Sequence, residues 1–123
     1  MDMKKIDLYK GYEGSGEIIV EEKTLGGTLL FELRMLDYHF DEILSNIPLG
    51  EYHPESVVYN YFYVEGWNED DQPWECKRIP EFYDQLKEIG PLSDVKEQTG
   101  LEALIEMSYS AIEKGNKLFI TLE

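Results

Sequence analysis

The chain has 123 residues and a mass of 14.4 kDa, a length typical of one domain, which we assign to residues 1–123. Its 11 basic and 26 acidic side chains give a formal net charge of −15 and an isoelectric point near 4.4. Such a field repels phosphate groups, so we expect no direct binding to nucleic acid or to a membrane surface. One cysteine excludes an internal disulfide framework, and no apolar stretch approaches the roughly 18 residues of a membrane span. These features predict a soluble, cytoplasmic protein.

The first third of the chain alternates apolar and polar residues, which predicts three strands, at residues 5–9, 17–22 and 29–36. A glycine-rich turn over residues 11–16 separates the first two strands. Leu25-Gly26-Gly27 is a tight hairpin signal between the second and the third. Residues 40–47 then carry apolar side chains at helical spacing, and Pro48 ends that segment.

The middle of the chain is dense in aromatic and β-branched residues. Residues 57–67 combine valines, tyrosines, a phenylalanine and a tryptophan, which predicts the strongest strand of the protein. A polar loop over residues 68–73 follows, and residues 74–78 are expected to return as a strand.

Helical signals dominate the last third. Pro80 suits the first turn of a helix that Gly90 ends, and Thr99 with Glu102 forms a capping box for a second helix that stops at Lys114 and Gly115. Residues 117–122 are expected to form a closing strand. Because strands come first and helices cluster late, we predict an α+β fold, a mainly antiparallel sheet with about three helices packed on one face.

Catalytic and metal-binding chemistry have few candidate residues. The only histidines are His39 and His53, and both are far in sequence from Cys76. A zinc site usually draws on ligands at short fixed spacings, and a thiolate nucleophile needs a neighbouring base. We therefore expect no metal site, no cofactor and no catalytic residue, and we interpret Cys76 as a packed, inert thiol.

The tyrosines at 59, 61 and 63 give a more informative signal. On a strand, Tyr59, Tyr61 and Tyr63 share one face, and the other face carries Val58, Asn60, Phe62 and Val64. Two interpretations stay open. The tyrosines either pack under the late helices or form a rigid, amphipathic platform of the kind found at protein interfaces.

Two tryptophans bracket the acidic loop. Trp67 and Trp74 either stack across a hairpin as a cross-strand pair or anchor a partner protein. In the second interpretation Glu69, Asp70 and Asp71 meet basic side chains of that partner. The candidate partner-binding residues are therefore Tyr59, Tyr61, Tyr63, Trp67, Glu69, Asp70, Asp71 and Trp74.

A small, strongly acidic α+β domain with one cysteine and an aromatic–acidic segment over residues 59–74 resembles the immunity proteins of bacterial polymorphic-toxin and contact-dependent growth inhibition systems. The resemblance implies a non-enzymatic protein that binds and neutralises a cognate toxin domain, often a nuclease. A nuclease carries a basic cleft, toward which an inhibitor of charge −15 is steered. Two alternatives stay open: a regulatory or scaffold module that binds proteins, and a small enzyme that uses His39 or His53 with a carboxylate.

Overall fold

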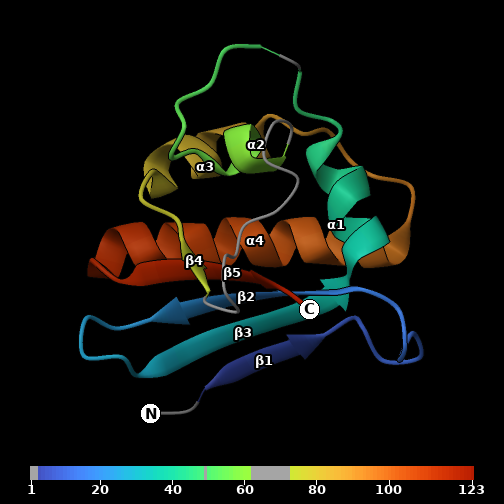
Figure 1. The fold of residues 1–123 in the computed structure, drawn as a ribbon, viewed down its shortest axis with the longest axis horizontal. Coiled ribbons are helices and arrows are strands. Elements are labelled where there is room, and N and C mark those ends of the chain that lie inside the picture. Colours follow the sequence, from blue (N-terminus) through green and yellow to red (C-terminus); the bar gives the residue numbers. More distant parts are fainter. Residues whose placement is uncertain (1–2, 49, 62–72) are drawn as a thin grey trace.

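The structure is a computed structural model that describes residues 3–48, 50–61 and 73–123. These residues form one sheet of five strands together with four helices, as Figure 1 shows. The strands are β1 (Lys4–Asp7), β2 (Glu17–Lys23), β3 (Leu29–Leu36), β4 (Trp74–Glu75) and β5 (Lys117–Leu122). The helices are α1 (Asp37–Leu44), α2 (Val57–Tyr59), α3 (Ile79–Lys87) and α4 (Val95–Lys114). The predicted α+β class is confirmed.

The strand order is β1-β3-β2-β5-β4. β2 runs antiparallel to both β3 and β5, and β4 runs antiparallel to β5. β1 lies at one edge and pairs with β3 in parallel, so the sheet is mixed rather than purely antiparallel. The predicted hairpin joins β2 to β3, and Gly27 adopts the positive φ of 92° that this tight turn requires.

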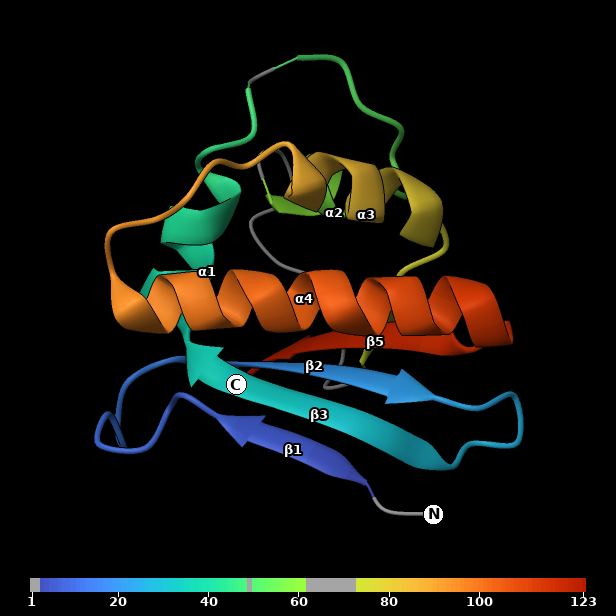
Figure 2. The same ribbon diagram turned by 180° about the vertical axis from the view of Figure 1, so that it is seen from behind.

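All described helices lie on one side of the sheet, and Figures 1 and 2 both show α4 running along that side with α3 beyond it. The alternating residues of β2 and β3 that face this side, such as Val20 and Leu33, are fully buried. Gly100 lets α4 come close, because a Cβ there would lie 2.7 Å from Cε of Met35 and 3.4 Å from Cδ1 of Ile43. The core therefore lies between the sheet and α4 and continues to α1, α2 and α3.

The strand predicted from residue 57 is wrong over residues 57–61. Val57 and Val58 are both buried, as successive residues of a helical turn can be, whereas a strand would send them to opposite faces. The Ser56 hydroxyl caps this turn by accepting the backbone N–H of Tyr59 at 3.0 Å. The Asn60 amide also donates to the carbonyl of Ser56 at 2.9 Å. Capping and burial outweigh the strand propensity of the valines.

The long helix α4 begins earlier than the capping box at Thr99 predicts. Asp94 is the N-cap, and its carboxylate accepts the backbone N–H of Glu97 at 3.0 Å. The helix ends where it was predicted to end, at Gly115, whose φ of 68° places it in the left-handed region. No helix in the described part of the chain is both long enough and apolar enough to cross a membrane.

Candidate functional site

Three of the predicted partner-binding residues lie in the described structure: Tyr59, Tyr61 and Trp74. The other five lie outside the described residues, namely Tyr63, Trp67, Glu69, Asp70 and Asp71. Tyr59 ends α2, so the predicted alternation of tyrosines along a strand does not begin there.

Tyr61 fastens the end of the α2 region to α1. Its hydroxyl donates to the carboxylate of Asp41, and its ring packs against the hydrophobic core. Burial raises the pKa of Tyr61 above its usual value, and the hydrogen bond to Asp41 raises it further. Tyr61 is thus a structural contact as well as a partly exposed side chain.

Trp74 lies on the short edge strand β4. It pairs with Ile120 of β5, is half-buried and packs against the core. Truncating Trp74 would therefore remove packing from the sheet edge, whatever its role toward a partner.

The described residues bring together a different acidic surface, where α1 lies beside the N-terminal end of α4 (Figures 1 and 2). We call it the acidic corner and define it as Tyr38, Asp41, Glu42, Asp94, Val95 and Glu97. Tyr38 is 58% exposed and Val95 is 79% exposed, so both side chains present apolar surface to solvent. Within the described ranges, no lysine or arginine forms an ion pair with a carboxylate of this corner. The Lys96 ammonium, from the same turn of α4, donates to the Tyr12 hydroxyl instead. The corner therefore combines exposed apolar surface with carboxylates that form no ion pair in the described part of the chain.

Electrostatic coupling shows that these groups share one environment. The charge of Glu42 raises the pKa of Tyr38 above its usual value, and Glu97 and Asp41 add to the effect. Partial desolvation raises the pKa of Glu97, and the charge of Asp94 raises it further. Like charges held this close favour an incoming cation or basic side chain.

A buried histidine lies beneath the corner. The ring of His39 contacts Tyr12 edge-on, with centroids 5.5 Å apart, and Tyr38 at 5.9 Å. His39 is 6% exposed, and its Nδ1 has no hydrogen-bond partner within the described ranges. One of its ring nitrogens lies within 4.8 Å of a carboxylate oxygen from each of Asp94 and Glu97.

The remaining candidates for nucleophile and base lie apart from this group. Burial raises the pKa of the Cys76 thiol to about 12, so the thiol is protonated at neutral pH. His53 is exposed, and its Nδ1 accepts the backbone N–H of Glu55 at 3.0 Å. Neither residue belongs to the one cluster of potential ligands found in the described residues.

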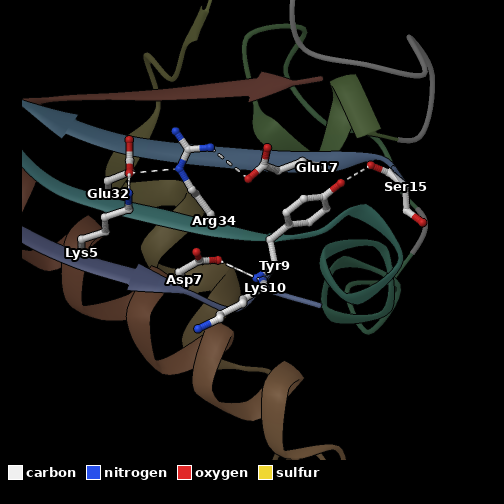
Figure 3. A network of polar contacts seen from close by, with 8 residues as sticks. All are labelled: Lys5, Asp7, Tyr9, Lys10, Ser15, Glu17, Glu32 and Arg34. Carbon is white, nitrogen blue, oxygen red and sulfur yellow. Dashed lines mark hydrogen bonds and ion pairs between the residues drawn. The ribbon is translucent and has the colours of Figure 1, made fainter. Parts of the chain in front are cut away.

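The outer face of the sheet, away from the helices, carries paired charges instead. Figure 3 shows the Arg34 guanidinium between the carboxylates of Glu32 and Glu17, each at 3.1 Å. Lys5 reaches Glu32 from β1 at 3.4 Å. The hydrogen bond to Glu32 is the main cause that raises the pKa of Arg34. This network neutralises much of its own charge, so it is a weaker candidate for attracting a basic partner than the acidic corner.

Sequence patterns missed the acidic corner for two reasons. Asp94 and Glu97 have the spacing of an N-cap and the third residue of a helix. Thr99 and Glu102 have the same spacing, and the start of the helix was predicted there instead. His39 lies 55 residues before Asp94, and no local pattern links residues so far apart.

No family model matches the chain, and neither a curated protein nor a solved structure matches it.

Proposed function

We propose that the protein is a non-enzymatic cytoplasmic binder that neutralises a basic partner, in the manner of bacterial immunity proteins that block a cognate toxin domain, here a basic nuclease. The observation that supports this most directly is the acidic corner, where carboxylates that form no ion pair among the described residues lie around exposed Tyr38 and Val95. Tyrosine is enriched among the residues that contribute most to binding, and surrounding charges steer association.

The charge of the whole molecule acts in the same direction. A net charge of −15 draws a basic domain from a distance, and the corner supplies a local target once the two proteins meet. An inhibitor with carboxylates in such an arrangement occupies positions that the phosphates of a nucleic acid would otherwise take.

The predicted aromatic–acidic segment adjoins this corner through one residue. The chain enters residues 62–72 from Tyr61, whose hydroxyl is bonded to Asp41 of the corner. Trp67, Glu69, Asp70 and Asp71 stay predicted binding residues, and the corner extends the proposed interface onto α1 and α4.

The test first identifies a basic toxin domain that co-purifies with the protein from its source organism, and then measures the association and dissociation rates of that domain at low and physiological salt. Tyr38→Ala should weaken binding by about 2 kcal/mol, roughly thirtyfold, because it removes a central aromatic contact. Glu42→Lys should mainly slow association, and added salt should reduce its effect.

The protein offers a matched control. Tyr109, which is 50% exposed, precedes Glu113 by four residues, as Tyr38 precedes Glu42. Tyr109→Ala should leave both rates unchanged, and Glu113→Lys should slow association less than Glu42→Lys does, because it reduces only the overall charge. Equal losses at the two positions would contradict the acidic corner as the interface, and the absence of any binding or protection from toxicity would contradict the proposed function itself.

A further inference from the structure

We propose that His39, Asp94 and Glu97 form a binding site for a divalent transition-metal ion of the Zn²⁺ class. This proposal goes beyond the proposed function, because it concerns a ligand that the protein would hold with or without a protein partner. The three residues come from α1 and from the first turn of α4, which the fold brings together.

The distances suit one ion after a small adjustment. One donor atom from each residue lies within 4.8 Å of the other two. Bonds of about 2.0–2.2 Å to nitrogen and oxygen place the donors of a tetrahedral zinc ion roughly 3.3–3.6 Å apart. Asp94 is exposed and Glu97 is half-buried, so rotation of their side chains can close the difference without moving either helix.

His39 supplies the second, independent observation. It is 94% buried, one of its ring nitrogens lies within 4.8 Å of an oxygen from each of the two carboxylates, and Nδ1 makes no hydrogen bond to the described residues. Buried polar atoms nearly always have a partner, so an imidazole in this position is unusual without one. The edge-on contact with Tyr12 and the contact with Tyr38 fix the plane of the ring. His39 would therefore need little rearrangement to bind an ion.

The donor set determines the kind of ion. Imidazole nitrogen favours zinc, copper, iron or nickel, whereas oxygen donors alone favour magnesium or calcium. Asp94 uses Oδ1 to cap α4, which leaves Oδ2 for an ion. The positive end of the α4 dipole opposes a cation by about half a charge, but the two carboxylates exceed it, and Glu42 adds negative potential nearby. Three protein ligands leave further positions open for water.

The test titrates ZnCl₂ alone into the full chain by isothermal calorimetry in physiological salt. One ion should bind per chain. Glu97→Gln and Asp94→Asn should each weaken binding by about tenfold or more. Asn retains the cap of α4, so Asp94→Asn removes ligand charge without removing the N-cap. His39→Gln should abolish specific binding and, with Co²⁺ as the probe, the visible absorption band of the bound ion.

Matched controls separate this site from general attraction to an acidic protein. His53→Gln removes the other histidine, and Glu102→Gln removes an exposed carboxylate of α4; both should bind Zn²⁺ as the unmodified chain does. Equal affinity in all variants would overturn the proposal, as would Mg²⁺ displacing Zn²⁺ at equal concentration. If His39→Gln does not fold, as judged by circular dichroism, Glu97→Gln and Asp94→Asn still decide the outcome.

Discussion

The two ends of α4 carry the same local pair in different surroundings. Near its N-terminal end, exposed Tyr38 of α1 lies four residues before Glu42; near its C-terminal end, exposed Tyr109 lies four residues before Glu113. In both pairs the glutamate raises the pKa of the tyrosine above its usual value. Taken by themselves, the two tyrosine–glutamate pairs are equivalent.

Their neighbours make them different. At the N-terminal end the nearby groups are further carboxylates, Asp94 and Glu97, which the helix dipole favours there. At the C-terminal end Tyr109 stacks against Tyr83 with centroids 5.8 Å apart, and the Lys87 ammonium lies 5.1 Å from the Tyr83 ring centroid. A cation thus accompanies the second pair through Tyr83. Near the first pair, the Lys96 ammonium lies 4.3 Å from the Tyr12 ring centroid and donates to the Tyr12 hydroxyl, not to a carboxylate of the corner. Proposals about binding therefore depend on which groups the fold gathers around a side chain, more than on its own type and exposure.

The largest predicted loss of stability follows from a substitution at Gly100. At this position α4 comes close to Met35 of β3 and Ile43 of α1. Gly100→Leu should lower the free energy of unfolding by about 3 kcal/mol, because the new side chain overlaps the ends of Met35 and Ile43. Glu102→Leu places the same side chain on the exposed face of α4 and should change stability by less than about 0.5 kcal/mol. Urea denaturation measures both, and equal midpoints would show that Gly100 is not a close contact.

A smaller effect is expected at the opposite end, where buried Glu22 holds the C-terminal end of α4 to the sheet. Its carboxylate accepts from the Ser110 hydroxyl and the Asn116 amide, both at 2.8 Å. Glu22→Gln should lower the free energy of unfolding by about 2 kcal/mol, since both bonds go to the one oxygen Oε2 and a neutral amide oxygen accepts them without the charge that strengthens them. In a double-mutant cycle, Ser110→Ala should cost less in the Glu22→Gln background than alone. Strict additivity would contradict the shared contact.

Asp94 caps the N-terminal end of α4 and Gly115 caps its C-terminal end, and substitutions at the two caps should differ in their cost in stability. Asp94→Ala should cost about 1 kcal/mol and Asp94→Asn only a few tenths, because asparagine also accepts the N–H of Glu97. At Gly115, with a φ of 68°, even the small change to alanine should cost about 1 kcal/mol. Thermal unfolding of the three variants at one pH compares them, and a harmless Asp94→Ala would show that the cap contributes nothing.

The smallest expected effect is a pH dependence of the acidic corner. Partial desolvation and Asp94 raise the pKa of Glu97 above its usual 4.5, so the folded chain keeps this proton where the unfolded chain has lost it. The contribution of Glu97 to stability is therefore present below pH 4.5 and is lost as the pH rises through the folded pKa. Glu97→Gln should melt slightly higher than the unmodified chain at neutral pH, with EDTA present, and the difference should vanish in acid. If the difference in melting temperature grew toward low pH instead, the folded state would not raise the pKa of Glu97, and the prediction would be wrong.

Much of the fold follows from local patterns. The alternation from Leu29 to Leu36 predicts β3, and the glycines before it predict the hairpin. Residues 57–61 were mispredicted because burial of both Val57 and Val58 outweighs their strand propensity. Propensity within a short window contains no information on what a distant element will cover.

The acidic corner lay further beyond local prediction. Neither Tyr38 in α1 nor Asp94 at the start of α4 carries a motif that points to the other element. The aromatic–acidic segment attracted attention because its residues are contiguous, whereas a surface assembled from two helices leaves no contiguous pattern. Only the packing of α1 against α4 places these carboxylates together.

The central place of β5 has a consequence for how the protein is made. β5 lies between β2 and β4, and within the described strands β4 pairs with β5 alone. A nascent chain that has reached Asn116 thus holds two strand edges with no strand between them. The ribosome must release residues 117–122 before the sheet can close, so no copy completes its sheet while these residues are still inside the ribosome. A translation that stops before residue 117 leaves open strand edges for proteases and chaperones to recognise.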